Sequence, residues 1–276
     1  MNADTPLIIC VATAGARATK EENPAVPYST AEIAQEIIRA AEAGASLAHV
    51  HARTPRGDPT QDVETFREIV ERVRARTDII LELSLGTHGF TLEQSLAPLE
   101  LNPVMASFPM GLRVQTQSSS SDVERGARLL LERHTRPNFA VSSPEASTIV
   151  LDLIERGLAG PVPCLSLSPQ GAENITSAAR SLMDLADLFE HKAHWWLMKG
   201  GKSGATQLAL RTLAIASGGH VRVGFEDHLR TYDDEALAPS NAWFVERMVS
   251  LARELGRPVA TAAAARALLR FQSPYP

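Results

Sequence analysis

Apolar and polar positions follow two alternating patterns along the chain. Short, mostly apolar runs are typical of strands that are buried on both faces of a sheet. Between them lie segments in which apolar residues recur every three or four positions, as in an amphipathic helix. The apolar runs predict strands at residues 7–12, 48–53, 79–84, 104–107, 138–141, 162–168, 194–198 and 220–223.

Segments with helical spacing separate these runs. Thr30 and Glu32 are typical of a helix start, and Gly44 ends that helix. Pro98 is expected to stop a short helix that Thr91 caps. The predicted helices occupy residues 30–43, 63–76, 92–97, 122–134, 146–156, 175–190, 208–217 and 241–255, with one more at 261–271.

This strand–helix alternation predicts a fold of the α/β class. Eight such units favour a single (β/α)8 barrel with an extra C-terminal helix, formed by residues 1–276 as one domain. No glycine fingerprint follows the first strand, as a dinucleotide-binding sheet would require. Because catalysis in such barrels takes place at the carboxyl ends of the strands, the residues that end each strand are the candidate site.

Composition narrows the class of partner. The formal net charge of −5 and the lack of a basic block argue against nucleic acid. Cys10 and Cys164 lie in apolar runs, so neither a disulfide framework nor a thiolate metal site is indicated. The apolar run at residues 6–14 is too short to span a membrane, and the residues before it do not resemble a signal peptide. We therefore expect a cytoplasmic enzyme without a membrane partner.

Two histidines and an arginine lie at the end of the second predicted strand. If the strand continues through Arg53, then His49, His51 and Arg53 share one face. A divalent metal would give the two imidazoles a function, because zinc readily takes neutral imidazole as a ligand. The alternative is a pair of histidines that hydrogen-bond to other groups at a strand end.

The last predicted strand is followed by two adjacent acids, Glu226 and Asp227. In a closed ring, only the first strand separates the last strand from the second, so Glu226 could complete a site with His49 and His51. Three protein ligands and one open position are typical of catalytic zinc. Alternatively, the acids could belong to a solvated loop or cap the next segment.

Taken together, these segments resemble the β-keto acid cleavage enzymes, whose better-known member cleaves 3-keto-5-aminohexanoate. The resemblance covers nearly the whole chain and is most specific at residues 49–53, HVHAR, and 218–227, GGHVRVGFED. It implies a zinc-dependent (β/α)8 barrel with one Zn²⁺ per chain, held by His49, His51 and Glu226. It also implies a reaction that converts a β-keto acid and acetyl-CoA, as co-substrate, into acetoacetate and a new CoA thioester.

The resemblance also implies roles for other strand-end residues. Arg222 and Asp227 match the family's catalytic arginine–aspartate pair, and Ser84 and Ser107 match hydroxyl positions in its substrate pocket. Asp227 could act as a base that Arg222 positions, or Arg222 could instead grip the carboxylate of the substrate. Relatives form homo-oligomers, so a dimer or tetramer is expected.

The chain departs from the family pattern around the pocket mouth. Arg17 and Ala140 stand where characterised relatives carry glutamate, and Thr54 stands where an acid is usual. Glu82 stands on the inward face, where relatives often have an amide. We therefore expect Arg17, Arg53, Glu82 and Ser107 to bind a substrate that is anionic or neutral rather than amino-bearing.

Two other functions remain open from the sequence alone. One is a zinc-dependent barrel hydrolase or aldolase that does not use CoA, and the other is a non-catalytic barrel that binds a metal or ligand. His88, His220 and His228 are interpreted as structural or solvent-facing residues. Trp195 and Trp196 should lie on opposite faces of one strand, so that at most one lines the barrel.

Overall fold

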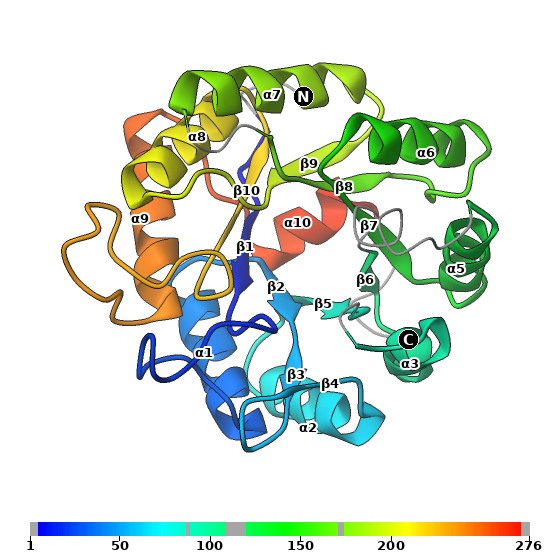
Figure 1. The fold of residues 1–276 in the computed structure, drawn as a ribbon, viewed down its shortest axis with the longest axis horizontal. Helices are drawn as coiled ribbons and strands as arrows, with labels where there is room; N and C mark the ends of the chain where they lie inside the picture. Colours follow the sequence, from blue (N-terminus) through cyan, green and yellow to red (C-terminus); the bar gives the residue numbers. More distant parts are fainter. Residues whose placement is uncertain (1–4, 87–88, 109–119, 171–173, 272–276) are drawn as a thin grey trace.

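A closed barrel of parallel strands organises the molecule, as the computed structural model shows for residues 5–86, 89–108, 120–170 and 174–271 (Figure 1). Eight strands pair in the ring order β1-β10-β9-β8-β7-β6-β5-β2, which confirms the predicted (β/α)8 barrel. The strands are β1 (Ile9–Ala12), β2 (Leu47–Val50), β5 (Ile80–Ser84), β6 (Met105–Phe108), β7 (Arg136–Val141), β8 (Cys164–Leu167), β9 (His194–Leu197) and β10 (His220–Val223).

Helices surround the barrel on the outside (Figure 1). Side-chain caps start most of them; at α1, for example, Ser29 accepts a hydrogen bond from the Glu32 backbone N–H, and Glu32 bonds back to the Ser29 backbone. These helices are α1 (Thr30–Glu42), α2 (Val63–Arg74), α3 (Leu92–Leu96), α5 (Ser120–Glu132), α6 (Pro144–Glu155), α7 (Ile175–Leu188), α8 (Gly204–Ala216) and α9 (Asn241–Glu254).

One local expectation held only in part and another was wrong. The α-helix α3 ends at Leu96, just before Pro98, and Thr91 caps it as expected, but the chain stays helical because a 3-10 helix, η1 (Ala97–Leu101), follows directly and has proline in its first turn. A proline is tolerated there, since the first N–H groups of a helix have no partner within it. The second predicted strand is also interrupted. It ends at Val50, and β3 (Ala52–Arg53) instead pairs antiparallel with β4 (Pro59–Thr60), outside the barrel.

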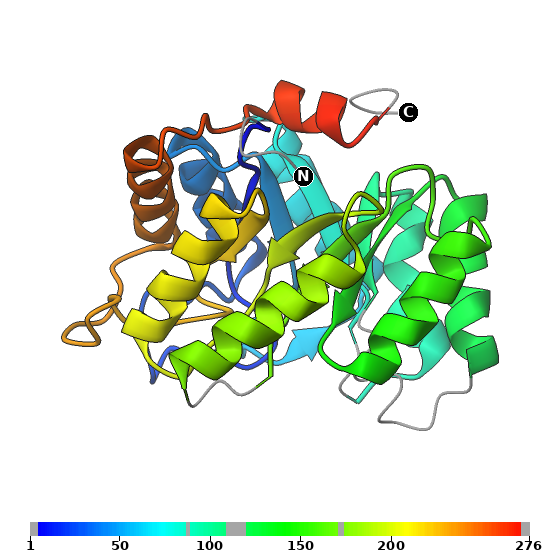
Figure 2. The same ribbon diagram turned by 90° about the horizontal axis from the view of Figure 1, so that it is seen from above.

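A last helix, α10 (Ala262–Leu268), closes the amino-terminal end of the barrel (Figures 1 and 2). Its residues pack into a second apolar core inside the ring, while the larger core lies between the strands and the outer helices. The inner core contains Ile8, Cys10, Leu47, Ile80, Met105, Cys164, Trp196, Ala260, Ala265 and Leu269. Trp195 belongs to the outer core, so the two tryptophans face opposite ways as predicted. Because this end is filled with apolar side chains, a polar site is expected at the other end, where the carboxyl ends of the strands lie.

Two of the three histidines interpreted as structural or solvent-facing lie in the described part of the chain, and both have protein partners. His220 is fully buried in the barrel and its Nδ1 accepts a hydrogen bond from the Ile8 backbone N–H. His228 Nε2 lies 3.2 Å from Asp234 Oδ1. His88 lies outside the described residues. None of the helices in the described part of the chain has the length and apolar character needed to cross a bilayer.

Candidate active site

A cavity of about 350 Å³ opens among the carboxyl ends of the strands. It lies where the sequence analysis placed the site, and all but one of the ten predicted site residues line it. The nine lining residues are Arg17, His49, His51, Glu82, Ser84, Ser107, Arg222, Glu226 and Asp227.

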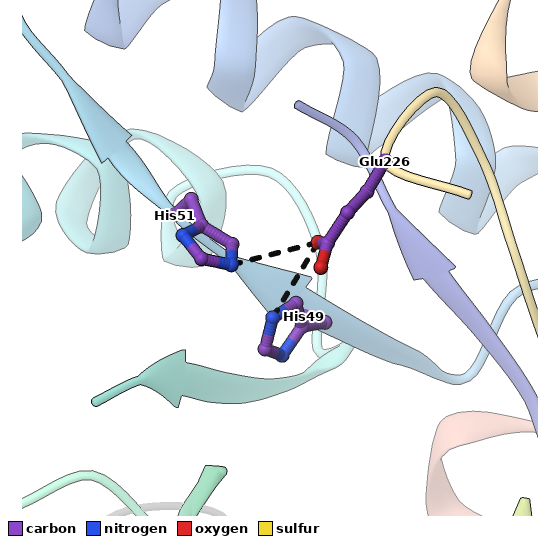
Figure 3. Close-up of side chains that lie close together, drawn as sticks. All are labelled: His49, His51 and Glu226. Carbon is purple, nitrogen blue, oxygen red and sulfur yellow. Dashed lines mark ion pairs between the residues drawn. The ribbon is translucent and has the colours of Figure 1, made fainter. Parts of the chain in front are cut away.

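Three of these side chains converge on one point (Figure 3). His49 Nε2 lies 3.5 Å from Glu226 Oε2, and His51 Nε2 lies 3.6 Å from the same oxygen. The three ligand atoms all fall within 4.8 Å of one another. Tetrahedral ligands about 2.1 Å from a metal are about 3.4 Å apart, so the two contacts with Glu226 have the spacing of ligands around one metal ion.

The turn after β10 brings Glu226 to the histidines. Gly224 has a φ of +135°, and a Cβ there would lie 2.3 Å from the Ala12 carbonyl oxygen, so the turn requires glycine. The Phe225 N–H then donates to Asn241 Oδ1 on α9, and the Glu226 N–H donates to the Ala12 carbonyl. This loop is therefore held against β1, on the side that faces β2.

The donor set fits a divalent metal. Glu226 Oε2 is buried without a hydrogen-bond partner among the described residues. Burial would raise the pKa of the Glu226 carboxyl, but Arg222, His49 and His51 outweigh it and hold the pKa well below its usual value. Burial lowers the pKa of His51. An anionic carboxylate beside neutral imidazole is the protonation state that metal binding requires, and a cation would supply the missing partner of Oε2.

Arg222 grips Asp227 beside this cluster. Arg222 Nε donates to Asp227 Oδ2 at 3.0 Å, and Arg222 Nη2 donates to Asp227 Oδ1 at 2.5 Å. The same Nη2 lies 3.2 Å from Glu226 Oε1. This two-pronged contact already engages the Arg222 guanidinium. Of the two roles considered for Arg222, the geometry therefore favours positioning Asp227 and not binding the substrate carboxylate.

Arg53 is the predicted substrate-binding residue that does not line the cavity. Its guanidinium is buried under the first loop and donates to the backbone carbonyls of Ala14, Gly15 and Ala18 at 2.9, 2.8 and 2.7 Å. The expected shared face with the histidines is lost because the strand breaks after Val50. Arg53 therefore holds in place the loop that carries Arg17, and we remove it from the substrate-binding set.

Glu82 has a contact that the sequence analysis did not predict, and Lys199 is a cavity residue that it missed. Glu82 Oε1 lies 2.6 Å from His49 Nδ1, so its nearest partner is a metal-ligand candidate rather than an open part of the cavity. Lys199 lies two residues after the end of β9 and lines the cavity as an exposed side chain. Lys199 could have been predicted from the sequence, because it follows a predicted strand at the end where barrel enzymes carry their sites.

The barrel, the three-ligand cluster and the positioned aspartate define a metal-dependent barrel enzyme. The chain belongs to the β-keto acid cleavage enzyme family, whose sequence model matches residues 6–271. The chain is therefore an enzyme that cleaves carbon–carbon bonds, and the family resemblance seen in the sequence is confirmed.

Individual relatives differ in the substrates that their names describe. The chain is 37% identical to a 3-keto-5-aminohexanoate cleavage enzyme of Fusobacterium nucleatum, over 96% of this chain and 98% of that protein. It is 32% identical to a 3-oxoadipate:acetyl-CoA acetyltransferase of Cupriavidus necator, over 97% of this chain and 96% of that protein. Overall identity thus places the chain near relatives that act on different keto acids.

Solved structures agree with the fold. ObcA in complex with oxaloacetate superposes with a TM-score of 0.76 at 18% identity, over 90% of this chain and 67% of that chain. The 3-dehydroquinate dehydratase of Aquifex aeolicus gives a TM-score of 0.54 at 12% identity, over 90% of this chain and 98% of that chain. At these identities the likeness shows the barrel alone.

Proposed function

We propose that the protein is a zinc-dependent β-keto acid cleavage enzyme that takes an anionic or neutral β-keto acid and acetyl-CoA and forms acetoacetate and a new CoA thioester. The observation that carries the proposal is Asp227, which Arg222 holds beside the cluster of His49, His51 and Glu226. Homo-oligomerisation as a dimer or tetramer belongs to the proposal through the family resemblance alone, and a cytoplasmic location belongs to it through the sequence analysis.

The residues of the cavity divide the chemistry among them. His49, His51 and Glu226 would hold Zn²⁺, which when present would supply a Lewis acid for the keto group of the substrate. Attack on the thioester requires a proton to leave the keto acid, and Asp227 is the carboxylate placed to accept it. Arg222 fixes the orientation of that carboxylate. Ser84 and Ser107 are register partners on β5 and β6, so their hydroxyls reach the substrate from one wall.

The charges that line the cavity support an anionic substrate. Arg17 and Lys199 are exposed on its wall, one after β1 and the other after β9. Among the described lining residues the carboxylates are those of Glu82, Glu226 and Asp227, which lie close to His49 or Arg222. A carboxylate at the far end of the substrate would therefore meet positive charge, and an ammonium group would be repelled.

The test is a panel of β-keto acids incubated with acetyl-CoA and zinc, with the CoA thioester products identified by mass spectrometry. Dicarboxylic compounds such as 3-oxoadipate should be turned over best, and 3-keto-5-aminohexanoate poorly. Turnover that proceeds without acetyl-CoA would instead indicate a hydrolase or aldolase. Stoichiometric zinc without turnover of any member of the panel would indicate a binding protein.

A further inference from the structure

A buried row of hydrogen bonds runs behind the metal cluster, from β8 to β2. Asn138 Nδ2 donates to Ser166 Oγ at 3.0 Å and to Glu82 Oε2 at 2.6 Å. The second oxygen of Glu82, Oε1, lies 2.6 Å from His49 Nδ1. All four side chains are between 2% and 6% exposed. Protein groups therefore occupy both oxygens of Glu82.

The contact with His49 sets the tautomer of that ring. His49 Nε2 is the atom that faces Glu226, at 3.5 Å, and its lone pair must be available to bind a metal. A neutral imidazole with an unprotonated Nε2 carries its proton on Nδ1, and that N–H donates to Glu82. The pairing joins neighbouring strands, because His49 and Glu82 are register partners on β2 and β5.

Charge provides a second, independent argument. With neutral histidines, the carboxylates of Glu82, Glu226 and Asp227 and the guanidinium of Arg222 leave two negative charges when all are ionised, and among these charged side chains all but the partly exposed Glu226 are buried. A divalent cation balances that excess. An amide at position 82 would leave only one negative charge for the cation to balance.

We infer that Glu82 is a positioning residue for the metal and does not bind the substrate. It orients the His49 ring, selects its tautomer and increases the negative charge that attracts the cation. Carboxylates placed behind a ligand in this way typically change metal affinity by about 10–100-fold. The inference rests on the metal site of the proposed function but not on the identity of the keto acid or on acetyl-CoA.

The experiment compares wild type with Glu82→Gln, in zinc competition against a chelator and in thermal melts of the metal-free and zinc-loaded proteins. Glu82→Gln should raise the zinc Kd by about 10–100-fold. Zinc-dependent stabilisation at one fixed zinc concentration should fall by the equivalent of about 1.4–2.7 kcal/mol. The metal-free variant should melt at the same temperature as metal-free wild type or higher, since one uncompensated buried charge has been removed.

Ser166→Ala is the matched control. It removes a hydrogen bond from the same buried row and leaves the contact between Glu82 and His49 in place. It should lower the melting temperatures of the metal-free and loaded proteins equally and leave the zinc Kd unchanged, which is the signature of a purely structural role.

Three results would overturn the inference. An equal loss of stability in both forms of Glu82→Gln, with an unchanged zinc Kd, would make Glu82 structural. An unchanged Kd with a raised KM for the keto acid would make it a substrate-binding residue. Wild-type protein that binds no zinc would overturn the metal site as well, so that failure is distinct from the other two.

Discussion

Arg17 is exposed on the cavity wall, on the loop that Arg53 holds in place, and replacing it with glutamate reverses the charge there. We expect Arg17→Glu to shift the substrate preference from anionic towards cationic β-keto acids. The physical reason is electrostatic, because the variant attracts an ammonium group and repels a distal carboxylate. Lys199→Glu should act in the same direction, since Lys199 lines the same cavity.

The size of the shift follows from the dimensions of the cavity. A sphere of about 350 Å³ is about 9 Å across, so a charged group bound inside lies about 6 Å from a charge on the wall. Coulomb's law gives about 0.7–1.4 kcal/mol for that pair at an effective dielectric constant of about 40–80. Charge reversal doubles the change, and salt screening at an exposed residue reduces it. The expected shift in relative kcat/KM is about 1–3 kcal/mol, or about 5–150-fold.

The assay measures kcat/KM for 3-oxoadipate, an uncharged-chain β-keto acid and 3-keto-5-aminohexanoate with saturating acetyl-CoA, at low and at high salt. Lys202→Glu is the control, because it makes the same charge change on the same loop as Lys199 but does not line the cavity. If Arg17→Glu and Lys202→Glu give the same ranking of the three substrates, the electrostatic account of specificity is refuted.

Three further changes test the metal, the base and the turn. Glu226→Gln should sharply lower the zinc bound per chain, measured by elemental analysis, because only two strong ligands remain; retention of a full equivalent would refute the ligand assignment. Asp227→Asn is nearly isosteric and should keep its zinc while losing turnover, so a near-normal kcat would exclude Asp227 as the base. Gly224→Ala should destabilise the protein by about 2 kcal/mol or more in urea denaturation, since its Cβ meets the Ala12 carbonyl; an unchanged midpoint would contradict the strain argument.

Much of the site could be predicted because it depends on strand order alone. Once the alternation of strands and helices predicts a closed ring, only the first strand can separate the last strand from the second. His49 and Glu226 are far apart in the chain, but this rule alone brings them together, and the 3.5 Å contact agrees with it. Closure of the ring was therefore enough to predict that these two residues are close, without knowledge of their side-chain positions.

The wrong prediction for Arg53 arises where the hydrogen-bonded pairing of a strand ends. Residues alternate between faces only while the strand continues, and no residue type in HVHAR marks the break after Val50 that turns Arg53 away. Glu82 was placed on the inward face, where it lines the cavity, but its contact with His49 was not predicted. Its contact with His49 depends on the register of neighbouring strands, which the order of the strands does not determine.

The helix that fills the amino-terminal end of the barrel limits how molecules can enter and leave. Ala265 and Leu269 fill that end with apolar side chains, so within the described part of the chain the cavity opens on the side that Arg17 and Lys199 line. His49 is buried while Arg17 and Lys199 are exposed, so the metal-ligand candidates lie deeper in the cavity than the charged residues of its mouth.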